Sequence, residues 1–113
     1  MARNDGLWVV EFKSSVGLFG KGVLVLDGDR LLGGDFGYYY SGHCREEGDR
    51  VKGEIDVIRF DPNAISVFGD VESFAIKFDG KVTGSDITAH ATSDHFPGVD
   101  MIIEASKKED LLG

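Results

Sequence analysis

Apolar and polar residues alternate along most of this chain with a period of two. In residues 7–14 the side chains of Trp8, Val10 and Phe12 fall on one face. Glu11 and Lys13 fall on the opposite face. Successive side chains of a β-strand point to opposite sides, so this alternation predicts a strand with one buried face.

The same alternation returns in later segments, and no long stretch has a helical pattern. The expected strands are Leu7–Ser14, Gly22–Leu26, Arg30–Leu32, Tyr38–Arg45, Val51–Phe60, Phe74–Phe78, Lys81–Thr92 and Val99–Ser106. Short links between them favour antiparallel neighbours, and closure of the sheet removes its exposed edges. The sequence therefore predicts an all-β fold, an eight-stranded antiparallel up-and-down β-barrel of the lipocalin (calycin) type. A β-sandwich is the alternative.

Glycine, aspartate and proline indicate where the strands end. Asp27-Gly28-Asp29 and Asp79-Gly80 are hairpin signals, because Gly and Asp tolerate positive φ. The pair Gly33-Gly34 predicts a sharp corner that leads into the next strand. Residues 61–72 break the alternation, and a turn or one helical turn is expected to start at Pro62. The apolar residues that follow would cover one open end of the sheet: Ala64, Ile65, Val67 and Phe68.

Length and charge narrow the class of protein. The 113 residues fit one domain, 1–113, in which residues 107–113 are expected to form a flexible tail or a short helical end. A net charge of −8 argues against direct nucleic-acid binding, which needs clustered Lys and Arg. The single cysteine, Cys44, excludes an intrachain disulfide framework. With no apolar signal segment and no apolar run long enough to span a bilayer, we expect a cytoplasmic protein without a membrane partner.

Residues that could support catalysis or metal binding do not come together in the sequence. His43 and Cys44 are adjacent, so on a strand they point to opposite faces and cannot share a metal or form a nucleophile pair. His90 and His95 could meet only if the loop between them folds back. The glycine-rich residues 17–22 lack the spacing and the following helix of a phosphate-binding loop. We therefore expect no enzyme activity, no catalytic residue, no metal and no cofactor.

The inward face of the predicted barrel is apolar. Its residues are most simply the core, but a barrel that leaves a cavity would offer the same residues to an apolar, lipid-like ligand. The expected interior residues are Trp8, Val10, Phe12, Tyr38, Tyr40, Phe74, Ile76, Phe78, Ile87, Met101 and Ile103.

Acidic residues gather around one expected turn. Glu46, Glu47 and Asp49 lie in it, and Glu54 and Asp56 lie in the strand that follows. The simple interpretation is a solvated turn. The functional interpretation is a protein-binding site, since clustered carboxylates attract the Lys and Arg side chains of a partner.

Several short motifs occur together in an order typical of one family. They are Asp5-Gly6-Leu7-Trp8, Gly20-Lys21-Gly22-Val23, Gly33-Gly34-Asp35 and Tyr40-Ser41-Gly42. Over residues 5 to about 60 the chain resembles the GrlR family, small bacterial negative regulators of type III secretion genes. The resemblance implies a lipocalin-like barrel that dimerises and binds a transcriptional activator. It also implies that an acidic run for activator binding falls on Glu46, Glu47, Gly48 and Asp49, where Gly48 interrupts the run.

Three hypotheses follow. The first is a non-enzymatic, homodimeric regulator that sequesters a transcriptional activator or another basic protein through the acidic turn. The second is a carrier of a small apolar ligand inside the barrel. The third is a subunit with no contact other than its own dimer.

Overall fold

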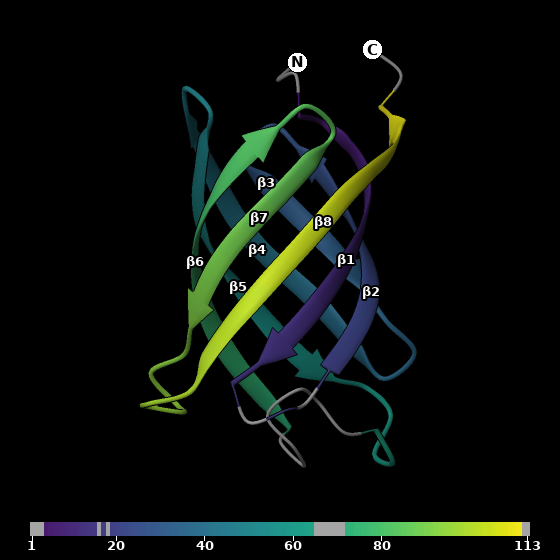
Figure 1. Ribbon diagram of the computed structural model, residues 1–113. Helices are drawn as coiled ribbons and strands as arrows, with labels where there is room; N and C mark the ends of the chain where they lie inside the picture. Colours follow the sequence, from purple (N-terminus) through teal and green to yellow (C-terminus); the bar gives the residue numbers. More distant parts are fainter. Residues whose placement is uncertain (1–3, 16, 18, 65–71, 112–113) are drawn as a thin grey trace.

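The computed structural model describes residues 4–15, 17, 19–64 and 72–111 (Figure 1). Its strands are β1 Gly6–Ser14, β2 Phe19–Asp27, β3 Arg30–Gly34, β4 Tyr38–Glu47, β5 Arg50–Arg59, β6 Ser73–Thr83, β7 Asp86–Thr92 and β8 Asp100–Asp110. Each strand pairs antiparallel with the next, and β1 pairs with β8, so the sheet closes into a barrel. The predicted eight-stranded up-and-down barrel is confirmed.

The barrel interior is packed with side chains from every strand. Trp8, Ile76, Met101 and Val10 are the largest of the fully buried ones. Aromatic rings meet edge to face, with 5.6 Å between the ring centres of Phe12 and Tyr40. Such edge-to-face pairs add to the free energy gained by burying their area. All of the expected interior residues are buried except Phe78, which is half-buried against the core.

The corner between β3 and β4 is held by a carboxylate as well as by glycine. Asp35 Oδ1 accepts hydrogen bonds from the backbone N–H groups of Gly37 and Tyr38, at 2.9 and 2.8 Å. Asp35 Oδ2 accepts the hydroxyl proton of Tyr40 at 2.5 Å. Burial and this contact raise the pKa of Tyr40 far above its usual range, so its hydroxyl stays a donor. The corner is therefore a structural element that carries Tyr38 and Tyr40 into the core.

One predicted turn is in the wrong place. Asp79-Gly80 is not a hairpin, because β6 runs through both residues to Thr83, and the chain turns at Gly84 and Ser85. Inside the barrel, a Cβ at Gly80 would lie 2.7 Å from the Ala89 Cβ. Gly80 thus allows β7 to approach β6, and no turn is needed to explain this glycine.

Two further segments were predicted as irregular, namely residues 107–113 at the end of the chain and residues 61–72 after β5. Residues 107–110 are not a flexible tail, since β8 continues to Asp110 and pairs with the first residues of β1. In the segment after β5, Ala64 is buried as expected and follows a turn in which its N–H bonds to Asp61 O at 3.0 Å. The other expected covering residues, Ile65, Val67 and Phe68, lie outside the described residues.

The described part of the chain holds no helix long and apolar enough to cross a bilayer.

Gly33 offers a direct test of how closely β2 and β3 pack. A Cβ at Gly33 would lie 2.1 Å from the backbone oxygen of Val23 and 2.6 Å from the Leu24 Cα. We expect Gly33→Ala to lower the free energy of unfolding by about 1–3 kcal/mol, because backbone atoms would have to move apart. Urea denaturation followed by the fluorescence of buried Trp8 measures this, with Ser41→Ala on the outer face of β4 as the control. Equal midpoints for Gly33→Ala and wild type would contradict the prediction.

Candidate functional site

The candidate site lies at the end of the barrel that holds the start of β1, the end of β8 and the β2–β3, β4–β5 and β6–β7 hairpins (Figure 1). The hairpin between β4 and β5 turns at Gly48 and Asp49 only, so Glu46 and Glu47 belong to β4 and not to the turn as predicted. Gly48 has φ of 64°, a left-handed conformation that glycine adopts readily. This explains why a glycine interrupts the acidic run, since a tight two-residue turn requires positive φ.

The three predicted binding residues do not share one surface. Glu46 continues the inward face of β4, is half-buried, and accepts a hydrogen bond from Asn4 Nδ2 at 3.0 Å. Glu47 and Asp49 are exposed. The structure therefore brings Glu47 and Asp49 to the surface and turns Glu46 toward the mouth of the barrel.

Both exposed carboxylates have a nearby cation. Glu47 Oε1 lies 3.2 Å from Arg45 Nε, and Asp49 Oδ2 lies 3.9 Å from Lys81 Nζ. Exposed ion pairs of this kind contribute only about 0–1 kcal/mol. A partner's cation can therefore replace either one at little cost.

Asn4 and Asp5 are buried polar residues at the mouth of the barrel, a feature that sequence reasoning missed. Asp5 Oδ1 accepts a hydrogen bond from the Gly28 N–H at 3.0 Å, and Trp8 Nε1 donates to Asn4 O at 2.9 Å. We name Asn4 and Asp5 the polar stopper, because these two buried polar residues lie next to Trp8 at this end of the barrel. The only signal in the sequence was a polar pair directly before a strand that carries a buried Trp.

Cys44 lies at the same end of the barrel, and the pKa of its thiol reflects the negative charges around it. The thiol is buried, and burial raises its pKa to about 11, with further contributions from the carboxylates of Glu46, Asp29 and Asp5. We name the set Asp5, Asp29, Glu46, Glu47 and Asp49 the acidic end. These carboxylates share this end of the barrel with Arg45, Arg50 and Lys81, so the excess of negative charge here is modest.

The interior next to the stopper contains a small apolar cavity. Its volume is about 40 Å³, and Trp8, Leu26, Cys44, Phe78 and Ala105 are among the residues that line it. Pockets for drug-sized ligands hold about 300–1,000 Å³, whereas one water molecule occupies roughly 30 Å³ of liquid. This cavity is too small for a lipid-like ligand.

The histidines and Cys44 do not converge on a reactive site. His43 is exposed and Cys44 is buried, as the opposite-face argument predicted. His90 Nε2 lies 3.5 Å from Asp100 Oδ1, while His95 Nδ1 accepts the Ala75 N–H at 3.4 Å. Within residues 4–15, 17, 19–64 and 72–111, no three His, Cys, Asp or Glu side chains are placed to hold a metal ion.

No protein-family model matches this chain, and no curated protein matches it in sequence.

The reactivity of Cys44 tests whether the polar stopper shields this thiol from solvent. With a pKa of about 11, the thiol near pH 8 has roughly 100-fold less thiolate than an exposed cysteine. We expect Cys44 to react with a disulfide reagent at least about 10-fold more slowly than an exposed thiol. A thiolate of higher pKa is the stronger nucleophile, but the small fraction of Cys44 that is thiolate outweighs this gain. The rate should rise as the pH approaches 11, and Asn4→Ala should accelerate the reaction by opening the stopper.

The matched control is an exposed thiol at the same end of the barrel. Ser85→Cys, made together with Cys44→Ser, places a thiol in the exposed turn between β6 and β7. Similar rates for this thiol and for Cys44 would contradict this shielding.

Proposed function

We propose that this chain is a non-enzymatic regulatory protein that binds a transcriptional activator, or another basic protein, through the acidic end. The observation that carries the proposal is the exposure of Glu47 and Asp49 at the tip of the β4–β5 hairpin. Glu46, Asp5 and Asp29 lie behind them and add to the same negative field around Cys44. A cationic surface of a partner would meet this field before contact.

The form of the hairpin supports a binding role. Residues 45–50 carry three carboxylates and two arginines, so the hairpin has a negative balance while the whole chain carries −8. Charges at the rim of an interface mainly raise the association rate and exclude partners of like charge. Since Arg45 and Lys81 make only exposed pairs with Glu47 and Asp49, the hairpin can exchange them for a partner's Lys or Arg.

The resemblance to the GrlR family supports an activator as the partner and the cytoplasm as the place of action. The protein would act by covering the activator's surface and not by contacting DNA, because its net charge repels phosphate. The apolar-carrier alternative has weaker support, since the apolar cavity next to Trp8 holds only about 40 Å³. The larger hollow beside it, about 670 Å³, is open and is lined mostly by polar and charged residues such as Asp29, Arg45 and Lys52.

The charge of the hairpin tip can be reversed without disturbing the stopper. We expect Glu47→Lys with Asp49→Lys to lose binding of the activator, because both carboxylates are exposed and the new lysines repel its cations. Wild-type binding should weaken as salt rises. The measurement is capture from extracts of the native host, identification of a DNA-binding regulator by mass spectrometry, and titration of that purified regulator.

The control changes net charge equally at a distance from the hairpin. Asp94→Lys with Glu104→Lys alters two exposed carboxylates, one in the loop after β7 and one on β8. Retained binding in the control and loss in the hairpin variant support the proposal. Equal binding by wild type and hairpin variant, or the absence of any captured DNA-binding regulator, would overturn it.

A further inference from the structure

An open hollow lies on the outer wall of the barrel, where β5 ends and β6 begins. We name it the β5–β6 hollow. It lies at the opposite end of the barrel from the β4–β5 hairpin, because β5 runs away from that hairpin to Arg59 and β6 returns from Ser73. Its volume is about 400 Å³, which is in the range of ligand sites. The residues that line it are Ile58, Arg59, Phe60, Pro62, Glu72 and Ser73.

A small residue beside larger ones leaves this space. Ser73 pairs across the strands with Ile58, and Ile58 pairs on its other side with Tyr39. All three side chains point out of the barrel, and the short side chain of Ser73 leaves room beside Ile58. Phe60 follows β5 directly and is 57 % exposed, while Tyr39 is 46 % exposed. The hollow therefore has apolar and aromatic walls that solvent reaches.

The backbone that carries Phe60 and Pro62 is held in place by hydrogen bonds. The N–H groups of Phe60 and Asp61 both donate to Gly37 O, at 3.0 and 3.3 Å. The Ala64 N–H donates to Asp61 O at 3.0 Å, which closes the turn around Pro62. A wall that is already fixed loses little entropy when a ligand packs against it.

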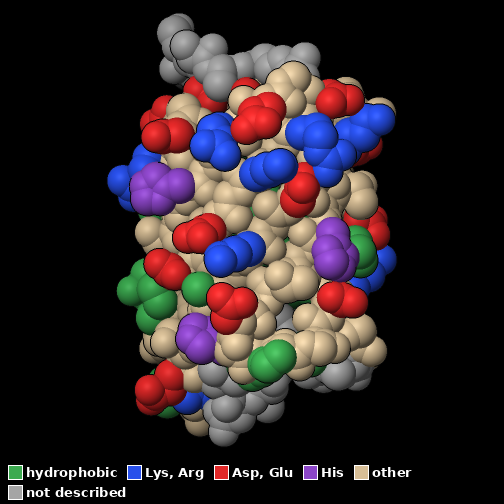
Figure 2. All heavy atoms as spheres, turned by 90° about the vertical axis from the view of Figure 1, so that its left-hand side faces the viewer, with side chains coloured by type: hydrophobic (Ala, Val, Ile, Leu, Met, Phe, Trp, Pro, Cys, Tyr) green, Lys and Arg blue, Asp and Glu red, His purple; other side chains and the backbone are tan. Residues whose placement is uncertain are grey.

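The face of the barrel around β6 changes along its length. Figure 2 shows Lys, Arg, Asp and Glu side chains of both signs over its upper part, toward the acidic end. Hydrophobic side chains are sparse on this face and lie mainly in its lower half. The β5–β6 hollow belongs to the lower half, since it lies at the start of β6.

Carboxylates are in excess around the hollow. Within two positions of its lining residues, the described charged residues are three acids and one base, namely Asp56, Asp61, Glu72 and Arg59. The guanidinium of Arg59 donates to Ala64 O at 3.2 Å.

The charges on the other side of β6 cancel. Lys77 Nζ lies 3.9 Å from Asp94 Oδ2, so this pair adds no net charge. With a neutral His95 beside Ala75, three acids and one base leave an excess of two carboxylates at the hollow.

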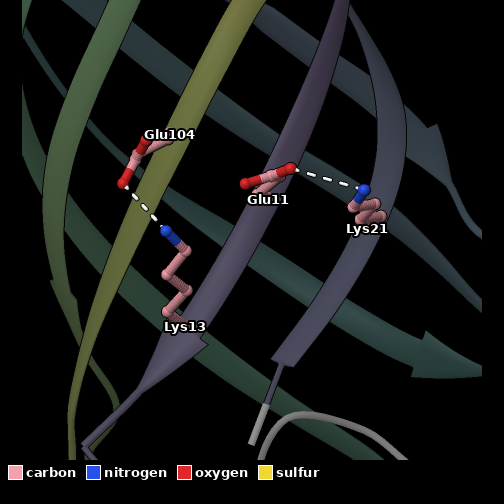
Figure 3. A network of polar contacts seen from close by, with 4 residues as sticks. All are labelled: Glu11, Lys13, Lys21 and Glu104. Atoms are coloured by element: carbon pink, nitrogen blue, oxygen red, sulfur yellow. Dashed lines mark hydrogen bonds and ion pairs between the residues drawn. The ribbon is translucent and has the colours of Figure 1, made fainter.

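The wall of β8, β1 and β2 has no such excess in the groups drawn in Figure 3. There Glu11 Oε1 lies 3.5 Å from Lys21 Nζ, and Lys13 Nζ lies 3.3 Å from Glu104 Oε1 (Figure 3). Each of these acids has a base beside it. A cationic ligand is therefore attracted to the β5–β6 hollow more than to this part of the wall.

The edge of β6 beside the hollow is covered, which narrows the way a ligand can bind. The ladder between β6 and β7 begins at Lys77 and Thr92, so the preceding residues of β6 lie outside it. His95 Nδ1 accepts the Ala75 N–H at 3.4 Å in place of a strand. A ligand is thus expected to use the side-chain walls of the hollow and not to add a strand to the sheet.

We propose that the β5–β6 hollow binds an extended, proline-containing segment of another protein, with a basic residue next to the prolines. A polyproline II segment is extended before it binds and needs no partner strand, and its pyrrolidine rings pack on exposed aromatic side chains such as Phe60. An arginine of the segment meets Glu72 through a charge-assisted hydrogen bond. The excess of carboxylates disfavours the other candidate for exposed rings, an anionic lipid surface.

The proposal does not rest on the acidic end, which lies at the other end of the barrel. The variant that carries Glu47→Lys and Asp49→Lys is therefore expected to bind the proline-containing segment like the wild type. Loss of activator binding and loss of peptide binding are separate results, so the failure of one proposal is distinguishable from the failure of the other.

The test uses the full chain and three short fluorescent peptides. The first has a Pro-x-x-Pro core with an arginine at one end, the second has alanines in place of the prolines, and the third has glutamate in place of the arginine. Fluorescence anisotropy is expected to show saturable binding of the first peptide with a Kd below about 1 mM. We expect the other two to bind at least about 10-fold more weakly, since each lacks one element that the hollow recognises.

Two variants change the hollow in different ways. Phe60→Ala removes an aromatic wall, and Ser73→Tyr fills the space beside Ile58. Each is expected to raise the Kd of the first peptide at least about 10-fold. Both positions are exposed, so both variants keep the fold, which the fluorescence of buried Trp8 verifies.

The matched control is Phe36→Ala. The Phe36 ring is 83 % exposed, more than that of Phe60, but it does not line the hollow. We expect this variant to bind the first peptide like the wild type, which separates the hollow from a general attraction of exposed rings.

Four results would overturn the proposal. They are no saturable binding of the first peptide, equal binding of all three peptides, wild-type binding by both hollow variants, and an equal loss in Phe36→Ala. Vesicles of phosphatidylcholine and phosphatidylglycerol provide the remaining comparison. Binding to these vesicles without binding to the first peptide would assign the exposed rings to a membrane surface and would also overturn the proposal.

Discussion

The pairing of β1 with β8 is the constraint on which the rest of the structure depends. Every other ladder joins strands that follow each other in the chain, whereas this one joins the first strand to the last. Among the described strands, none has a free side along its whole length, and closure removes the full-length edges at which a sheet can pair with another chain. The register shifts between Leu7 and Trp8, which lets β8 continue past the bulge to the level of Gly6. Trp8, the first residue after this shift, is fully buried inside the closed barrel.

Closure also decides where function can reside. In a closed barrel each side chain points either into the interior or out to solvent, with no third option. The interior of this barrel is filled by aromatic and branched side chains, and close approaches at Gly33 and Gly80 remove further space. Chemistry that depends on contact with a partner must therefore use the outer wall or the ends. The stopper of Asn4 and Asp5 reinforces this limit at the acidic end.

The sequence predicted the number of strands and the interior residues because both depend only on local alternation. It misplaced the turn at Asp79-Gly80, since that dipeptide is identical in a hairpin and in a strand, and only the approach of Ala89 explains Gly80. The inward direction of Glu46 could have been predicted, because Tyr40 and Cys44 point inward and the alternation of a strand then turns Glu46 inward as well. The hydrogen bond between Asn4 and Glu46 could not have been predicted, because the two residues are 42 positions apart in the chain and no local pattern links them.

The grouping of apolar side chains on the outer wall was beyond sequence reasoning for a related reason. Val23, Leu32 and Tyr39 lie in three different segments, and only the register of β2, β3 and β4 makes them neighbours. Once they are neighbours, exposed apolar side chains gather on the outer wall of β2 to β4, whereas Glu47 and Asp49 lie on the hairpin at the end of the barrel, so the register of the sheet separates the two kinds of surface.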